Sequence, residues 1–256
     1  MNTKFYIPIL SLFFLASISA CKQEPITVSK VSTRQKKIDS TIATDKTIDS
    51  FIKPFRNHLN KTLDSTLCIA TITFTKNDGG LESTLGNLMA DISLQRAQPI
   101  FKERYHKEID FVLFNHGGMR APILKGAVTS RAAFELMPFE NELVAVELSY
   151  EKVKELISYL AEKQRAHPIS NIQLSILKDA KTSKEVTING HLLQKGKNYI
   201  VLTTDYLQQG GDSMNFFKDP IQLYKIDYKL RNALIDYFKS VDTLQVKLDK
   251  RMHYAK

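Results

Sequence analysis

Two loops in this chain combine paired glycines with charged or polar side chains. The first covers residues 115–120, with the sequence NHGGMR, and follows the apolar run 112–114. Paired glycines let a backbone approach a ligand closely, and their N–H groups can face an anion. Arg120 adds a planar, permanently charged guanidinium whose geometry suits phosphate. Taken alone, the loop does not distinguish an anion site from a tight turn that carries a surface arginine.

The second loop covers residues 205–212, with the sequence DYLQQGGD, and again follows an apolar run. Its Asp212 carboxylate has enough acceptor positions for two adjacent sugar hydroxyls. Tyr206 in this loop and Phe139, which follows Pro138, are flat aromatic residues. For any single aromatic residue a place in the core is the default. Beside glycine loops, however, such rings can also stack a nucleobase, at roughly 1–3 kcal/mol per base.

Metal-ligand patterns are not found among the histidines and cysteines. The pair Asn115-His116 resembles one motif of metallophosphatases, but no Asp-x-His precedes it. Five further histidines are isolated and lack metal-ligand spacing, so we expect surface or structural roles for them: His58, His106, His167, His191 and His253. Cys68 stands in an apolar stretch and is expected to be a buried thiol.

Apolar patterns predict the strands and helices that position these loops. Strands are expected at residues 66–74, 109–114, 142–148, 172–176 and 199–206. Helical spacing appears around residues 85–92, 153–160 and 230–238, with Ser83 or Thr84 as the N-cap of the first helix. A short helix is expected between Thr129 or Ser130 and Pro138, and Asn189-Gly190 predicts a hairpin turn. Because these elements intermix, we expect an α/β fold class, with a single mixed α/β domain over residues 47–256.

The first 46 residues have the composition of an address and a tether. Residues 1–20 predict a cleaved lipoprotein signal peptide, because Lys4 precedes a short apolar run that ends in Ile18-Ser19-Ala20-Cys21. The alternative is an ordinary signal peptide followed by a chance cysteine. We expect lipidation of Cys21, a flexible polar tether over residues 21–46, and anchorage in the bacterial cell envelope, at the outer membrane or cell surface.

The chain is basic, with a formal net charge of +9. Such a surface is compatible with nucleic acid, anionic lipid or a phosphorylated small molecule. Apart from a short cluster at residues 34–37, the basic side chains are scattered rather than gathered in a stripe. We therefore expect no nucleic-acid partner.

Four motifs together resemble the C-terminal domain of the 5′-nucleotidase family. They are Leu85-Gly86-Asn87-Leu88 with Asp91, Asn115-x-Gly-Gly-x-Arg120, Pro138-Phe139 and Tyr206-x-x-x-Gly-Gly-Asp212. They occur in the order and at the spacing of that family, and the resemblance spans nearly the whole chain after the tether. It implies the fold of the family's substrate-binding domain.

The resemblance also implies roles for individual residues. Phe139 and Tyr206 would clamp the nucleobase, Asp212 would hold the ribose hydroxyls, and Arg120 would meet phosphate, while Asn115 and Asn141 would touch the base edge. The predicted substrate-binding set is Asn115, Gly117, Gly118, Arg120, Phe139, Asn141, Tyr206, Gly210, Gly211 and Asp212.

Three positions depart from the family pattern. Residues 79–83 lack an arginine usually found there, Glu140 replaces a common glycine, and Ser213-Met214 replaces a glycine and an aromatic residue. The first two departures weaken the case for tight binding of a polyanionic nucleotide.

The family's hydrolysis is carried out by two metal ions in a separate N-terminal domain. The resemblance covers no such domain here, so we expect no catalytic residue, no metal site and no cofactor in this chain. Divalent metals are expected only in a separately encoded metallophosphatase partner. The leading hypothesis is the nucleotide-binding half of a split phosphohydrolase of nucleotide catabolism, inactive without that partner. The alternatives are an autonomous nucleoside- or nucleotide-binding envelope lipoprotein and, as a third hypothesis, a hydrolase with its own unrecognised site.

Overall fold

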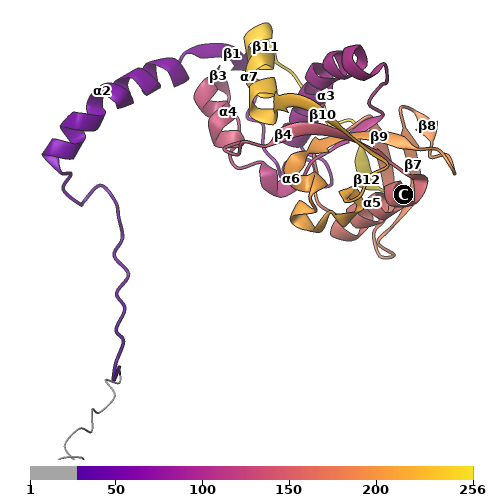
Figure 1. Ribbon diagram of the computed structural model, residues 1–256, viewed down its shortest axis with the longest axis horizontal. Helices are drawn as coiled ribbons and strands as arrows, with labels where there is room; N and C mark the ends of the chain where they lie inside the picture. Colours follow the sequence, from indigo (N-terminus) through magenta and orange to yellow (C-terminus); the bar gives the residue numbers. More distant parts are fainter. Residues whose placement is uncertain (1–27, 256) are drawn as a thin grey trace, which may run out of the picture. The chain divides into compact units, whose positions relative to one another are not determined.

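The computed structural model describes residues 28–255 (Figure 1). The chain divides into two units, with the boundary between residues 51 and 52. In the first unit, residues 28–45 form neither helix nor strand, and all of them except Asp39 are exposed. The predicted signal peptide and Cys21 lie outside the described residues.

Helix α2 (Lys46–Leu63) begins in the first unit and continues into the second. The carboxylate of Asp45 starts it by accepting hydrogen bonds from the backbone N–H groups of Thr47 and Ile48, at 2.8 and 3.1 Å. None of its residues is buried. Within residues 28–255, no helix has the length and apolar character needed to cross a membrane.

A five-stranded mixed sheet forms the centre of the second unit (Figure 1). Its strand order is β10 (Gln222–Lys229), β4 (Glu142–Leu148), β9 (Tyr199–Thr204), β2 (Phe111–Leu113) and β5 (Ile169–Ser170). β2 and β9 run parallel, and every other neighbouring pair is antiparallel. Every residue of β2 and β9 is buried, which accounts for their continuous apolar sequences.

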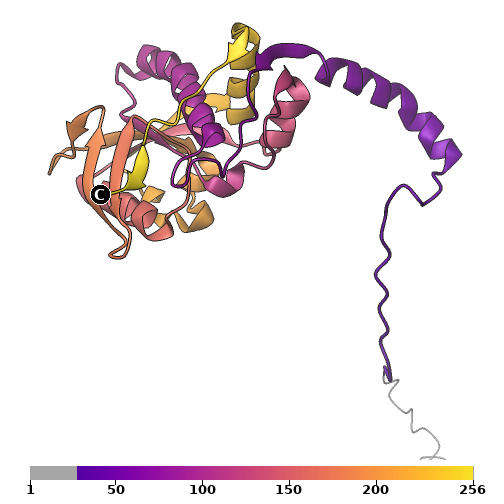
Figure 2. The ribbon, with the colours of Figure 1, turned by 180° about the vertical axis from the view of Figure 1, so that it is seen from behind.

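Helices cover this sheet on both sides (Figures 1 and 2). α3 (Thr84–Tyr105) and α7 (Leu230–Ser240) pack together along one face, while α5 (Tyr150–Lys163) contacts β4 from the other. As predicted, Ser83 caps α3, because its hydroxyl accepts a hydrogen bond from the N–H of Gly86 at 3.0 Å. The short α4 (Ser130–Leu136) packs against α7 and is capped by Thr129.

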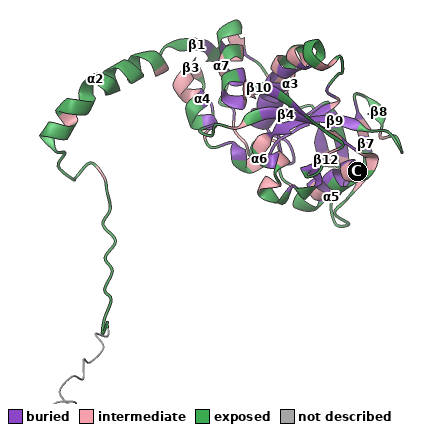
Figure 3. Cartoon of the chain, viewed as in Figure 1, coloured by how far each residue is buried: buried purple, intermediate pink, exposed green. Residues whose placement is uncertain are grey.

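Two smaller sheets complete the second unit. One has the order β11 (Thr243–Leu244), β1 (Thr66–Ala70), β3 (Gly126–Thr129), and the other β12 (Met252–Tyr254), β6 (Ile172–Leu177), β7 (Thr182–Ile188), β8 (His191–Leu192). Asn189 and Gly190 join β7 to β8 with φ angles of 51° and 75°, which confirms the predicted hairpin. Cys68 is buried in the core, as expected. The strands β4 and β9 of the central sheet are largely buried, whereas α2 is mostly exposed (Figure 3).

The fold is therefore the predicted mixed α/β class, with three differences at strand ends. β1 stops at Ala70, four residues before the predicted end, and β2 starts at Phe111 rather than residue 109. The predicted strand 199–206 is wrong at its end, because Thr204 begins the helix α6 (Asp205–Gln208). The Thr204 hydroxyl accepts a hydrogen bond from the N–H of Leu207 at 3.3 Å, which places Tyr206 on a helical turn.

Candidate functional site

The topology of the central sheet brings three chain segments to one edge. Because β2 and β9 are parallel neighbours, their carboxyl ends lie at the same edge. β4 runs antiparallel to β9, with Leu143 opposite Thr204, so the start of β4 also lies there. The loop after β2, helix α6 after β9 and the loop before β4 consequently meet.

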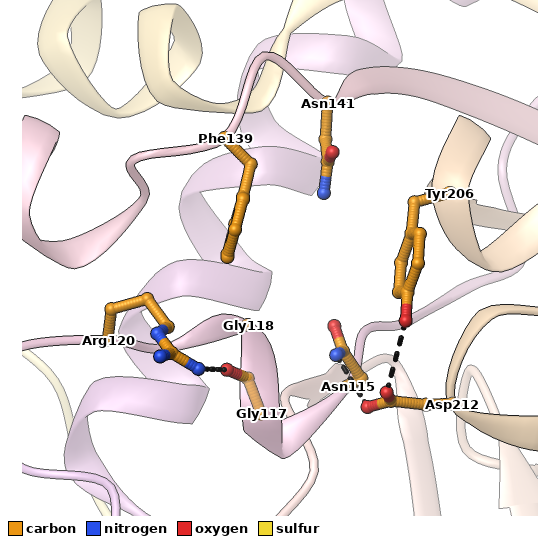
Figure 4. Close-up of a pocket in the computed structure, with 8 residues that line it drawn as sticks. All are labelled: Asn115, Gly117, Gly118, Arg120, Phe139, Asn141, Tyr206 and Asp212. Atoms are coloured by element: carbon orange, nitrogen blue, oxygen red, sulfur yellow. Dashed lines mark hydrogen bonds between the residues drawn. The ribbon is translucent and has the colours of Figure 1, made fainter. Parts of the chain in front are cut away.

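These segments enclose a pocket of about 260 Å³ (Figure 4). Eight of the ten predicted site residues line it: Asn115, Gly117, Gly118, Arg120, Phe139, Asn141, Tyr206 and Asp212. Phe139 and Tyr206 stand on opposite sides, with Asn141 between them at one end and Asn115 and Asp212 at the other. The space between the two rings is an open slot.

The exposure of Phe139 and Tyr206 decides whether their rings belong to the core or are free to stack against a ligand. Phe139 is 42% exposed and Tyr206 is 45% exposed, so neither ring belongs to the hydrophobic core. Large apolar side chains with that exposure leave a ring face available for a planar group. The arrangement supplies two such faces across one slot.

The Asp212 carboxylate is oriented by its neighbours at the end of the slot. The side-chain amide of Asn115 donates to Oδ2 at 2.6 Å, and the phenol of Tyr206 donates to Oδ1 at 3.3 Å. The Tyr159 hydroxyl donates to the backbone carbonyl of Asp212 at 3.1 Å. Asp212 has a φ of 52°, in the left-handed region. The hydrogen bonds to its carboxylate and to its backbone carbonyl hold that conformation.

Gly210 and Gly211, the other two residues of the predicted binding set, lie behind the pocket and not in its lining. A Cβ atom on Gly211 would lie 2.4 Å from Cε1 of Tyr206, so the ring rests directly on the glycine backbone. Gly210 has a φ of 89°, which glycine adopts without strain. The ring of Tyr206 can therefore occupy this position only because residue 211 has no side chain.

Arg120 lies at the mouth of the pocket. Its guanidinium carbon is 6.0 Å from the centre of the Phe139 ring, and its backbone N–H donates to the carbonyl of Leu136 at 2.9 Å. The side chain is exposed, and within residues 28–255 no carboxylate forms a salt bridge with it. Its positive charge is thus available to an anion entering the slot.

Two supporting residues carry no sequence signal of their own. His167 is 5% exposed, and its Nδ1 lies 3.2 Å from both the carbonyl of Phe114 and the N–H of His116. Burial lowers the pKa of His167 to about 4, against the opposing effect of the Phe114 carbonyl. The neutral imidazole therefore braces the glycine loop that follows β2.

Asp205 joins two walls of the pocket. Its Oδ1 accepts hydrogen bonds from the N–H of Glu142 at 3.1 Å and from the N–H of Tyr206 at 2.8 Å. One carboxylate oxygen thereby ties the first residue of β4 to the helical turn that carries Tyr206.

In the described part of the chain, no three His, Cys, Asp or Glu side chains gather as metal ligands.

Comparison with known proteins identifies the fold family. A family model described as 5′-nucleotidase, C-terminal domain, matches residues 65–219. This chain belongs to that family. A 5′-nucleotidase-related protein of Glossina morsitans morsitans is 25% identical over 239 residues, covering 84% of this chain and 42% of the relative. A 5′-nucleotidase of Vibrio cholerae is 23% identical over 221 residues, covering 81% and 36%.

Solved structures support the same 5′-nucleotidase C-terminal fold. A 5′-nucleotidase precursor from Thermus thermophilus superposes with a TM-score of 0.67 at 19% identity, covering 81% of this chain and 42% of that one. The NAD nucleotidase of Haemophilus influenzae gives a TM-score of 0.62 at 17% identity, covering 82% and 41%. This chain spans less than half the length of each of these proteins.

Within this 5′-nucleotidase C-terminal domain, every pocket-lining residue falls inside the matched residues 65–219. β10 and α7 lie beyond that range, although both pack against elements inside it. The elements that support the site of this family member therefore extend beyond the C-terminal limit of the match.

Proposed function

We propose that this 5′-nucleotidase C-terminal domain binds nucleosides or nucleotides in the slot between Phe139 and Tyr206. The observation that carries the proposal is the pair of half-exposed rings on opposite sides of one pocket, with an oriented carboxylate at its end. A nucleobase is flat and fits between two aromatic faces, whereas its ribose carries two adjacent hydroxyls that suit a carboxylate.

The remaining pocket residues complete this assignment. Asn141 lies at the end of the slot opposite Asp212 (Figure 4), where its amide would meet the base edge. Asn115 serves chiefly to hold Asp212 in place. Arg120 offers its guanidinium to the phosphate of a nucleotide, since charge-assisted hydrogen bonds to phosphate oxygens are strong.

For the chemistry, we propose that the chain supplies the substrate-binding half of a split nucleotide phosphohydrolase. A separate metallophosphatase chain would bring the divalent metals that activate water. Family membership supports this proposal. The competing proposal is an autonomous binding protein, which is favoured by the fact that the whole pocket forms within this one chain.

The proposed location is the bacterial envelope, with an acylated Cys21 as the anchor. The residues Ile18-Ser19-Ala20-Cys21 after an apolar run support it. A Cys21→Ser variant should lose incorporation of labelled fatty acid and no longer sediment with membranes. Unchanged labelling in that variant would exclude Cys21 as the acceptor.

Isothermal titration with adenosine, guanosine, cytidine and uridine tests the binding proposal. Phe139→Ala and Tyr206→Ala should each weaken the affinity for the preferred nucleoside by roughly 1–3 kcal/mol, the usual contribution of one stacking face. Tyr254→Ala is the matched control, because Tyr254 is 40% exposed and lies outside the pocket. Wild-type protein that binds neither these four nucleosides nor their 5′-monophosphates would overturn the proposal.

Co-purification from the native envelope separates the split enzyme from the autonomous binding protein. The full chain should recover a metallophosphatase, identified by mass spectrometry, and the reconstituted pair should hydrolyse a nucleoside monophosphate only when divalent metal is present. If the protein binds nucleosides but no metallophosphatase co-purifies with it, the result supports the autonomous binding protein.

A further inference from the structure

The loop that carries Phe139 is held by three consecutive residues from a distant part of the chain. Lys229, Leu230 and Arg231 lie where β10 passes into α7. The backbone N–H of Leu230 donates to the carbonyl of Asn141 at 3.0 Å. The side chains of Lys229 and Arg231 both bind the carboxylate of Glu140.

Arg231 makes most of these contacts. Its side chain is only 6% exposed, and its Nη1 donates to the carbonyls of Met137 at 3.3 Å and Phe139 at 3.2 Å. Nη2 meets one oxygen of Glu140, and the guanidinium carbon lies 4.2 Å from the centre of the Phe134 ring. The planar fork is thus fixed against an aromatic face while it holds two carbonyls and one carboxylate.

Glu140 is ionised in this arrangement. The hydrogen bonds from Lys229 and Arg231 lower its pKa to about 2. Each carboxylate oxygen has its own cation, because Lys229 binds Oε2 and Arg231 binds Oε1. Residues 137–141 are therefore held at four points, namely the backbone carbonyls of Met137, Phe139 and Asn141 and the carboxylate of Glu140.

Such anchoring matters because of the exposure of Phe139. With 42% of its surface exposed, the ring is not fixed by core packing. Its place in the slot follows instead from the backbone on either side of it, which Arg231 and Leu230 hold. A half-exposed ring on an unanchored loop would sample other orientations and lose stacking contact.

We propose that Arg231, Lys229 and Glu140 form a clamp that positions the Phe139 ring for nucleobase stacking opposite Tyr206. The three residues are hereafter called the Glu140 clamp, and Arg231 is its central positioning residue. The inference rests on the proposed nucleoside-binding function and adds residues outside the pocket to it. The clamp acts on affinity only through Phe139.

A set of double-substitution variants tests the clamp by titration with adenosine. Glu140→Gln and Arg231→Lys should each weaken adenosine binding roughly three- to tenfold in the otherwise wild-type protein and in the Tyr206→Ala background. In the Phe139→Ala background the same changes should alter the affinity less than twofold, since the ring that they position is absent. Asp227→Asn is the matched control, because Asp227 of β10 pairs with Arg104 of α3 and has nearly the exposure of Glu140, 63% against 62%.

A second readout needs no ligand. The chain contains no tryptophan, so the indole of a Phe139→Trp variant reports on this position alone. Adding Glu140→Gln should lower its fluorescence anisotropy, because the ring gains local motion, whereas adding Asp227→Asn should not. If Arg231→Lys does not fold, Glu140→Gln carries both measurements, since that side chain is exposed.

The outcomes are separable. Equal losses of affinity in the wild-type and Phe139→Ala backgrounds, or an unchanged anisotropy, would overturn the clamp. Absence of adenosine binding in the wild-type protein would count against the proposed function, and the anisotropy would still decide whether the clamp orders residue 139. Coupled losses together with a lowered anisotropy would establish it.

Discussion

The phenol of Tyr206 donates a hydrogen bond to Oδ1 of Asp212, so a wall of the slot and the carboxylate at its end are directly connected (Figure 4). The bond is 3.3 Å long, which is at the weak end for an O–H donor. Because each carboxylate oxygen has two lone pairs, Asp212 still has acceptor positions for two hydroxyl groups. In the proposed nucleoside complex, the Tyr206 side chain would therefore both face the base and steady the carboxylate that accepts from the ribose hydroxyls.

Asp212→Asn should reduce the affinity for ribonucleosides much more than for their dideoxy analogues. The substitution removes a charged acceptor, and hydrogen bonds to charged groups contribute roughly 1.5–3 kcal/mol. Titration with adenosine and 2′,3′-dideoxyadenosine measures the difference. Equal losses for the two ligands would mean that Asp212 acts on the shape of the pocket and not on the hydroxyls.

Gly211→Ala should weaken nucleoside binding by roughly 1–3 kcal/mol, about as much as Tyr206→Ala, because its methyl group would occupy the space of the phenol ring. The double variant should be no weaker than Tyr206→Ala alone, since both changes remove the same stacking face. Adenosine titration of the three variants checks this. Additive losses would show that Gly211 contributes in some way other than through the ring.

Arg120→Ala should discriminate between ligands that differ by a phosphate. AMP should lose roughly 1–2 kcal/mol of affinity, below the full value for a charge-assisted bond because the guanidinium is exposed and screened. Adenosine should be nearly unaffected. Arg34→Ala, which removes the same charge from residues 28–45, is the control. An equal loss of AMP affinity in that variant would show that the effect comes from net charge alone.

His167 gives the folded protein a specific pH dependence. Its folded-state pKa of about 4 lies below the ordinary 6.5. Between pH 4 and pH 6.5, His167 therefore binds a proton in the unfolded chain but not in the folded chain. The stability from this site is complete above about pH 6.5 and is lost as the pH falls towards 4. Relative to His167→Asn, which keeps a polar atom near Nδ1, the wild-type free energy of unfolding should fall by roughly 2–3 kcal/mol between pH 7 and pH 4.

Urea denaturation of both proteins at several pH values measures that difference. Parallel pH profiles for the wild-type protein and His167→Asn would show that His167 is not the titrating group. Carboxylates titrate in the same range, but their contribution is common to both proteins and cancels in the comparison.

The pocket could be predicted from sequence because its residue types restrict local structure. Paired glycines after a buried strand, a proline beside Phe139 and a carboxylate after Gly210-Gly211 each mark a special backbone position. The strand over residues 142–148 was predictable to the residue, because its apolar run ends at clear breaks. Local chemistry therefore marked the two loops, whereas the full binding set, of which eight residues line the pocket, came from the family resemblance.

The supports of the pocket could not be predicted in this way, because their partners are distant in sequence. Arg231 lies 94 residues from Met137, and His167 lies 53 from Phe114. No local period or motif encodes such a hydrogen bond. Tyr206 was expected in a strand because an apolar run precedes it, but the Thr204 hydroxyl caps a helical turn there instead.

Helix α2 is not among the predicted helices, although Ile48, Phe51, Ile52 and Phe55 follow helical spacing. Pro54 interrupts that pattern, and a proline inside a helix removes one backbone hydrogen bond. The predicted tether ended at residue 46, so almost all of α2 lies in the predicted α/β domain, where its helical periodicity was the available signal.

The pairing of β10 with β4 determines where this chain can be shortened. A fragment ending at residue 219 would keep every pocket-lining residue and the whole family match, yet it would lack β10. β4, whose residues Leu143–Val146 are buried, would then become an edge strand with unpaired N–H and C=O groups, which is a template for aggregation. Soluble fragments of this protein should therefore keep β10, and by the same argument β12, which pairs with β6 in another sheet. Each covering strand then stays with the strand that it protects.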